Sequence, residues 1–65
     1  MPIMHVFLIE GRSVQEKEAF IAAVTEAAVR TVGVKPESVR IMIEDVPKSN
    51  FGISGRSVAS MSRES

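Results

Sequence analysis

The sequence contains no cysteine, tryptophan or tyrosine, and only one histidine among its 65 residues. Without cysteine there are no disulfide bonds and no thiolate zinc sites. A single histidine also argues against a metal site built from imidazole ligands. We therefore expect no bound metal.

The chain also lacks an excess of charge of either sign, since eight basic residues balance eight acidic ones. No basic cluster is present, so nucleic acid is not an expected partner. The apolar runs are far too short to span a membrane, which argues against a membrane partner. The first residues lack the basic region of a secretory signal, and we expect a cytoplasmic protein.

Hydrophobic residues nevertheless make up 45% of this short chain. A domain of this length is near the lower limit for burying an adequate core, and it usually needs disulfides, a metal or oligomer contacts. The surplus of apolar side chains therefore predicts a homo-oligomer, without distinguishing a trimer, tetramer or hexamer. We expect residues 1–65 to form a single domain.

The order of apolar and polar residues predicts a strand followed by a helix. Residues 3–9 are apolar on both faces except at His5, which is typical of a strand covered on both sides in a parallel sheet. Ser13 and Glu16 have the spacing of a capping box, which predicts a helix from residue 14 to about residue 32. The residues expected to end it are Gly33 and Pro36. We interpret His5 as a packed or interface residue.

A second strand is predicted over residues 39–46, parallel to the first through a right-handed crossover. Val39, Ile41 and Ile43 should face the helix, and Arg40, Met42 and Glu44 the opposite side. Arg40 could there belong to a site or pair with Glu44. Residues 47–55 are rich in turn formers and predict a short hairpin, with 56–65 as an arm or tail. The fold class is thus α/β (α+β), with a β-α-β subunit.

Pro2 is the first candidate for chemistry. Removal of Met1 would turn its ring nitrogen from an amide into a secondary amine, a compact base fixed to the backbone. In a parallel sheet Pro2 and Arg40 open neighbouring strands, which lie about 5 Å apart. Arg12, in contrast, follows after eight extended residues, roughly 25 Å from Pro2 of the same chain. We expect Arg12 to reach Pro2 only from another subunit.

A base that works at neutral pH needs a pKa below that of an ordinary secondary amine. Burial beside an apolar ring such as Phe51 disfavours the ammonium form. A guanidinium about 8 Å away adds roughly 2 kcal/mol of repulsion at an effective dielectric constant of about 20. Arg12 and Arg40 can therefore hold the amine neutral near pH 7, where general-base catalysis is efficient. The same guanidinium groups can bind a carboxylate through two hydrogen bonds.

Four short motifs carry a resemblance to a known family: Pro2, Glu10-Gly11-Arg12-Ser13, Ser38-Val39-Arg40 and Phe51-Gly52-Ile53. Together, over roughly residues 2–55, they resemble the 4-oxalocrotonate tautomerase family. The resemblance implies a β-α-β subunit that dimerises and assembles into a hexamer with sites shared between chains. It also implies an isomerase that ketonises small 2-hydroxydienoates or 2-oxo acids, such as 2-hydroxymuconate, without a cofactor and in aromatic hydrocarbon catabolism.

The resemblance also implies a role for each residue. Pro2 would be the general base. Arg40 would bind one carboxylate and the 2-hydroxy or 2-oxo group, while Arg12 from a neighbouring subunit would hold the far carboxylate and draw electron density towards it. Phe51 would keep the pocket apolar. The remaining substrate-binding residues would be Leu8, Ser38 and Ile53.

Two alternatives remain open. Family members that act as haloacrylate dehalogenases use an added carboxylate, and Gly52 and Ile53, directly after Phe51, supply none; this favours a tautomerase over a dehalogenase or decarboxylase. A non-catalytic oligomeric scaffold would result if Met1 were retained. Two positions depart from the family, which has glycine and an acidic residue there: Ser54 and Arg56.

Overall fold

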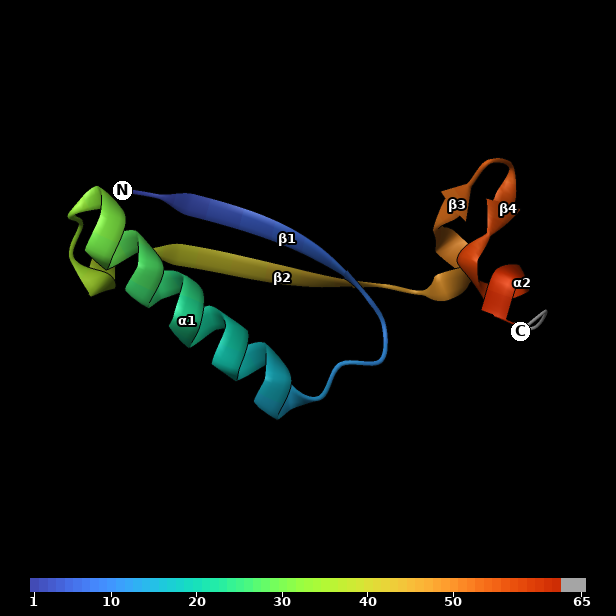
Figure 1. Cartoon of the computed structure of the whole chain (residues 1–65), viewed down its shortest axis with the longest axis horizontal. Helices are drawn as coiled ribbons and strands as arrows, with labels where there is room; N and C mark the ends of the chain where they lie inside the picture. The colour runs from blue at the N-terminus through green and yellow to red at the C-terminus, as the bar shows by residue number, and fades with distance from the viewer. Residues whose placement is uncertain (63–65) are drawn as a thin grey trace.

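The computed structural model describes residues 1–62 and shows a long helix on a two-stranded sheet, followed by a small C-terminal unit (Figure 1). The first part comprises β1 (Ile3–Ile9), α1 (Val14–Val32), η1 (Pro36–Ser38) and β2 (Arg40–Val46). The C-terminal unit comprises η2 (Lys48–Asn50), β3 (Gly52–Ile53), β4 (Arg56–Ser57) and α2 (Val58–Ser62). The predicted β-α-β unit with a C-terminal hairpin is therefore confirmed.

Both ends of α1 are fixed by the residues that the sequence predicted. The Ser13 hydroxyl accepts a hydrogen bond from the backbone N–H of Glu16 at 3.1 Å, and the Ser13 N–H donates to Oε1 of Glu16 at 2.9 Å. This reciprocal capping box satisfies two N–H groups that have no partner inside the helix. At the other end Gly33 adopts φ +78° and donates its N–H to the carbonyl of Val29. Its lack of a side chain makes this left-handed end accessible at little cost.

The two strands pair in parallel, from Ile3 opposite Arg40 to Ile9 opposite Val46. Alternate residues face α1 and are half-buried: Met4, Val6, Leu8, Ile41 and Ile43. The ion pair between Lys17 and Asp45, at 2.6 Å, ties the helix to β2 on this side.

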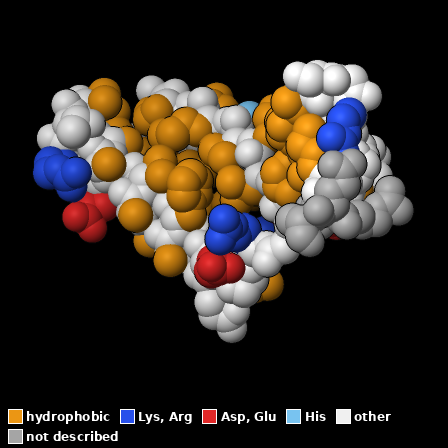
Figure 2. Space-filling view, turned by 45° about the vertical axis from the view of Figure 1, so that its right-hand side comes forward, with side chains coloured by type: hydrophobic (Ala, Val, Ile, Leu, Met, Phe, Trp, Pro, Cys, Tyr) orange, Lys and Arg blue, Asp and Glu red, His pale blue; other side chains and the backbone are white. Residues whose placement is uncertain are grey.

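The opposite side of the sheet, which we call the open sheet face, has no cover within the described part of the chain. It carries apolar side chains at Ile3, Phe7 and Met42, with exposed fractions of 64%, 62% and 52%. The expectation that β1 is covered on both faces is therefore wrong for a single chain, because one helix can cover only one face of a sheet. Figure 2 shows hydrophobic side chains over much of the face in view. Among the described residues only Ala28 is buried, so the chain encloses almost no core of its own.

Two element boundaries differ from the prediction: the end of the C-terminal hairpin and the start of β2. The hairpin of β3 and β4 extends to Ser57, beyond the expected limit at residue 55. Residues 56–62 form β4 and α2, residues 63–65 lie outside the described part, and the role of 56–65 as an arm or tail stays a prediction. The serine-rich sequence explains why α2 forms, because Ser57 accepts the N–H of Ser60 at 3.1 Å and so caps it. At its start, β2 begins at Arg40 and not at residue 39, since the N–H of Val39 donates to Pro36 within η1.

The turn between β3 and β4 predicts a stabilising substitution. Ser54 has φ +53° and is followed by Gly55 at +82°, whereas L-residues other than glycine adopt this region at a cost of about 1–2 kcal/mol. Ser54→Gly removes that cost but adds freedom to the unfolded chain, so we expect unfolding free energy to rise by about 0.5 kcal/mol. Urea denaturation at fixed chain concentration measures it. Gly55→Ser, the matched control, should lower stability; a loss of stability in Ser54→Gly would contradict the strain.

Candidate functional site

Pro2 and Arg40 lie together at the end of the sheet where both strands begin. The backbone N–H of Arg40 donates to the carbonyl of Pro2 at 3.0 Å. Pro2 directly precedes Ile3, which pairs with Arg40 at the start of the two strands. The parallel register thus brings together the two residues that the sequence placed at one end. Pro2 itself is half-buried, and Met1 beyond it is 77% exposed.

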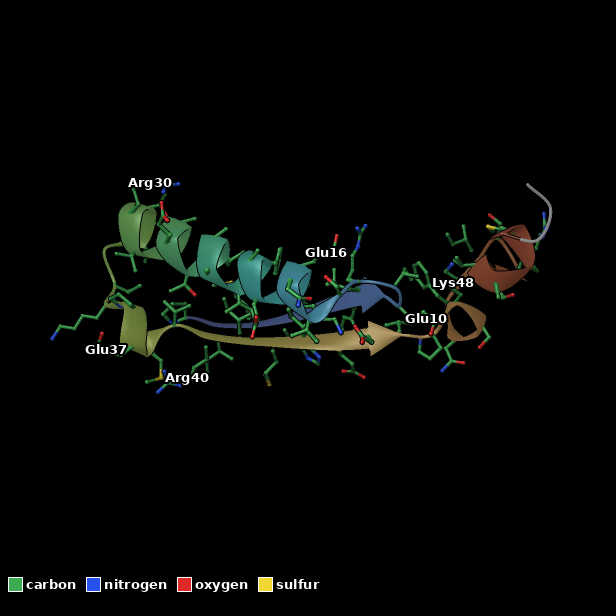
Figure 3. All side chains as sticks on the ribbon, turned by 90° about the horizontal axis from the view of Figure 1, so that it is seen from below. Glu10, Glu16, Arg30, Glu37, Arg40 and Lys48 are labelled. Atoms are coloured by element: carbon green, nitrogen blue, oxygen red, sulfur yellow. The ribbon has the colours of Figure 1, made fainter. Side chains whose placement is uncertain are left out.

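The short helix η1 orients Arg40 and Ser38. Nη1 of Arg40 donates to the backbone carbonyl of Glu37, so the turn that precedes β2 holds the guanidinium at this end of the sheet. Figure 3 shows Glu37 and Arg40 there, with Arg40 on the side away from α1. Ser38 donates its hydroxyl to the carbonyl of Lys35 at 2.8 Å. Its oxygen retains lone pairs that can accept a hydrogen bond from a ligand.

The open sheet face carries one polar pair among its apolar side chains. Nε2 of His5 lies 2.9 Å from Oε1 of Glu44, and the His5 ring stacks on Phe7 with centroids 4.5 Å apart. Glu44 is therefore partnered by His5 and not by Arg40, which answers the alternative of an Arg40–Glu44 ion pair. The position of His5 on this face fits its interpretation as an interface residue.

Arg12 lies at the other end of β1, in the loop that enters α1. It lines a pocket of about 220 Å³ together with Leu8, Glu16, Lys17 and Phe20. Its Nη1 is 3.7 Å from Oε2 of Glu16, and the Arg12 side chain is 64% exposed. The backbone N–H of Ser13, and to a lesser degree the Arg12 charge, lowers the pKa of the Glu16 carboxyl below its ordinary value.

Phe51 lines a second pocket, of about 300 Å³, with Phe7, Ile9 and Val46. This pocket continues the open sheet face at the end where both strands finish. Glu10 links the sheet to the C-terminal unit here, because its carboxylate accepts the backbone N–H of Lys48 at 2.9 Å (Figure 3). Ile53, also expected to line a pocket, is 47% exposed on β3.

A single chain therefore divides the expected site residues between two ends of the sheet (Figure 1). One end has Pro2, Ser38 and Arg40, and the other has Leu8, Arg12, Phe51 and Ile53. The sequence predicted this separation for Arg12 but placed Phe51 beside Pro2. The register of the two strands explains the difference. The end of β2 pairs with Ile9, far from Pro2, and Phe51 follows that end in the chain.

Two acidic residues gain a place near the site that sequence reasoning did not give them. Glu16 was interpreted only as a capping residue, and its ion pair with Arg12, four residues earlier in the loop before α1, was not predicted. Glu10 was only part of a motif, and no local pattern indicates its bond to Lys48, which depends on the sheet register. Within residues 1–62, no three acidic or histidine side chains gather as metal ligands, and no helix is long and apolar enough to cross a membrane.

Comparison with known proteins relates the whole unit to enzymes. A family model described as tautomerase enzyme matches residues 2–61. A 2-hydroxymuconate tautomerase from Comamonas testosteroni is 44% identical over 63 residues, which is 97% of this chain and 100% of that protein. The structure of a 4-oxalocrotonate tautomerase isozyme from Methylibium petroleiphilum superposes on this chain with a TM-score of 0.94 at 39% identity. The match covers 98% of this chain and 100% of that isozyme's chain. A heterohexameric 4-oxalocrotonate tautomerase from Chloroflexus aurantiacus gives 0.87 at 30% identity, covering 94% and 98%.

Proposed function

This chain belongs to the tautomerase family of isomerases, and we propose that it ketonises small 2-hydroxydienoates such as 2-hydroxymuconate with Pro2 as the general base. The observation that carries the proposal is the position of Pro2 beside Arg40 at the start of the parallel strands. A free secondary amine there would lie next to a group that binds carboxylates and enolate oxygens. The proposal requires that Met1 be removed.

The reaction needs only the transfer of one proton. The Pro2 amine removes the proton from the 2-hydroxyl group, and the oxygen's electron pair forms the carbonyl as the double bonds shift along the dienol. The resulting ammonium then gives the proton to the distal carbon. Arg40 stabilises negative charge on the oxygen and binds the neighbouring carboxylate. Arg12, supplied by a second chain, binds the far carboxylate, and Phe51 and Leu8 keep the pocket apolar.

The electrostatics of this arrangement favour a neutral amine. Positive guanidinium groups disfavour a second positive charge on Pro2, and an apolar wall adds the cost of desolvating it. Both effects lower the pKa of an amine, which brings it towards the working pH, where a general base combines proton affinity with a deprotonated resting form.

The proposal includes a homo-oligomer, with a dimer as building block and a hexamer as the assembly. Three observations support it: the open sheet face exposes Ile3, Phe7 and Met42, the chain has almost no core, and the expected site residues lie at two ends of one subunit. The relative from Chloroflexus aurantiacus is a heterohexamer. A cytoplasmic location and a role in aromatic hydrocarbon catabolism stay predictions.

The proposal is tested by following the ultraviolet absorbance of 2-hydroxymuconate, with 3-chloroacrylate as the competing substrate. We expect the processed protein to ketonise the dienol with a kcat/KM at least about 10⁴ M⁻¹s⁻¹, in the ordinary enzyme range, and to release little chloride. Intact mass gives the state of the N-terminus. Faster turnover of chloroacrylate would favour the dehalogenase, and an inactive protein that retains Met1 would favour the scaffold.

A further inference from the structure

The hydrogen bond that caps α1 also holds the Glu16 carboxylate beside Arg12. Its Oε1 accepts the N–H of Ser13 at 2.9 Å as part of the capping box, while its Oε2 lies 3.7 Å from Nη1 of Arg12. The carboxylate cannot turn away from Arg12 without giving up the helix cap. The guanidinium expected to meet a substrate therefore has a built-in carboxylate neighbour.

The other cation of this pocket is also neutralised by its own chain. Lys17 pairs with Asp45 at 2.6 Å, and only 26% of the Lys17 side chain is exposed. Arg12 and Lys17 thus each have a carboxylate partner, and the pocket carries little uncompensated positive charge. Glu16 keeps its negative charge at neutral pH, because the Ser13 N–H lowers its pKa further below neutrality.

From this geometry we propose that Glu16 is a specificity-determining residue that weakens the preference of Arg12 for a second carboxylate on the substrate. The inference rests on the proposed function, which makes Arg12 the partner of the far end of the substrate. A ligand carboxylate at Arg12 competes with Glu16 for the guanidinium and is repelled by its charge. A methyl group at the same position neither competes with Glu16 for the guanidinium nor is repelled by its charge. Glu16 therefore favours monocarboxylic dienols relative to dicarboxylic ones.

The test uses binding, which does not depend on proton transfer. Muconate and sorbate are both six-carbon acids with the same two conjugated double bonds. They differ at one end, where muconate has a carboxylate and sorbate a methyl group. Dissociation constants for both are measured by NMR titration of the processed, assembled protein and of Glu16→Gln. Glutamine keeps a side-chain oxygen for the Ser13 N–H, so the cap survives while the charge is lost.

The chain offers a matched control in Glu26→Gln. Glu26 pairs with Arg30 at 3.5 Å with the same four-residue spacing as Arg12 and Glu16. Arg30 lies at the opposite end of α1 from Glu16 (Figure 3). Both substitutions remove one exposed carboxylate of α1 from an ion pair with an arginine four residues away, but only Glu16→Gln does so in the pocket.

We expect Glu16→Gln to tighten muconate binding about threefold to fivefold, the range of exposed ion pairs, and to change sorbate binding less than about twofold. Glu26→Gln should change neither. An unchanged ratio of the two dissociation constants in Glu16→Gln, an equal change in Glu26→Gln, or no binding of muconate to either Glu16 form overturns the inference. Failure of the proposed function gives a different result: the wild-type protein would not ketonise 2-hydroxymuconate.

Discussion

Replacement of Pro2 with alanine should lower kcat for 2-hydroxymuconate at least about a hundredfold, the scale of general-base catalysis, with a much smaller change in KM. Alanine leaves a primary amine that rotates freely about its Cα–N bond, whereas the proline ring fixes the nitrogen next to the strand. The carboxylate contacts of Arg12 and Arg40 are unchanged, so substrate binding should persist. Initial rates at several substrate concentrations separate kcat from KM.

The N-terminal mass must accompany these rates, because retained methionine would inactivate either protein by converting the nitrogen to an amide. Wild-type protein with Met1 still attached is the natural control, and it should be as inactive as the alanine variant or more so. A processed, correctly assembled Pro2→Ala protein with wild-type kcat would exclude Pro2 as the base.

The β-α-β unit could be predicted because its signals are local. The Ser13–Glu16 capping box and Gly33 define both ends of α1 within one residue. Alternation of apolar residues identified which side of β2 faces the helix. The C-terminal unit could not be predicted in the same way, because α2 depends on hydrogen bonds between Ser57 and Ser60, two residues that elsewhere favour loops.

The candidate site shows a different limit of sequence reasoning. The motifs identified residue types, and chain geometry correctly separated Arg12 from Pro2. The position of Phe51 required the register of β1 against β2, which no local pattern encodes. The open sheet face required knowledge of how many chains assemble, since its exposure in one subunit is a property that a partner can remove. Mixing variants of two subunits tests which chain supplies each side chain.

At a substrate concentration well below the wild-type KM, where both Pro2→Ala and Arg12→Ala are strongly impaired, mixing the two variants should restore about a quarter of wild-type activity if subunits combine at random in a symmetric oligomer. Arg12→Ala alone should raise KM for the dicarboxylate by about ten- to a hundredfold, because a charged bidentate contact is lost. In a hybrid, a chain with Pro2 intact can receive Arg12 from its neighbour. Half the chains supply each group, which gives the expected quarter of complete sites.

The design depends on exchange of subunits, so the two proteins are unfolded together in urea, refolded and compared with the same proteins refolded apart. A mixture of Pro2→Ala with the double variant is the matched control, and it should stay inactive because no chain has Pro2. If Pro2 and Arg12 of one chain formed the site, every hybrid subunit would still lack one of them, and mixing would restore nothing. Activity that merely equals the sum of the separate variants would thus exclude a site shared between chains. Restored activity would explain why one β-α-β unit keeps its base and its far carboxylate-binding group at opposite ends of the same strand.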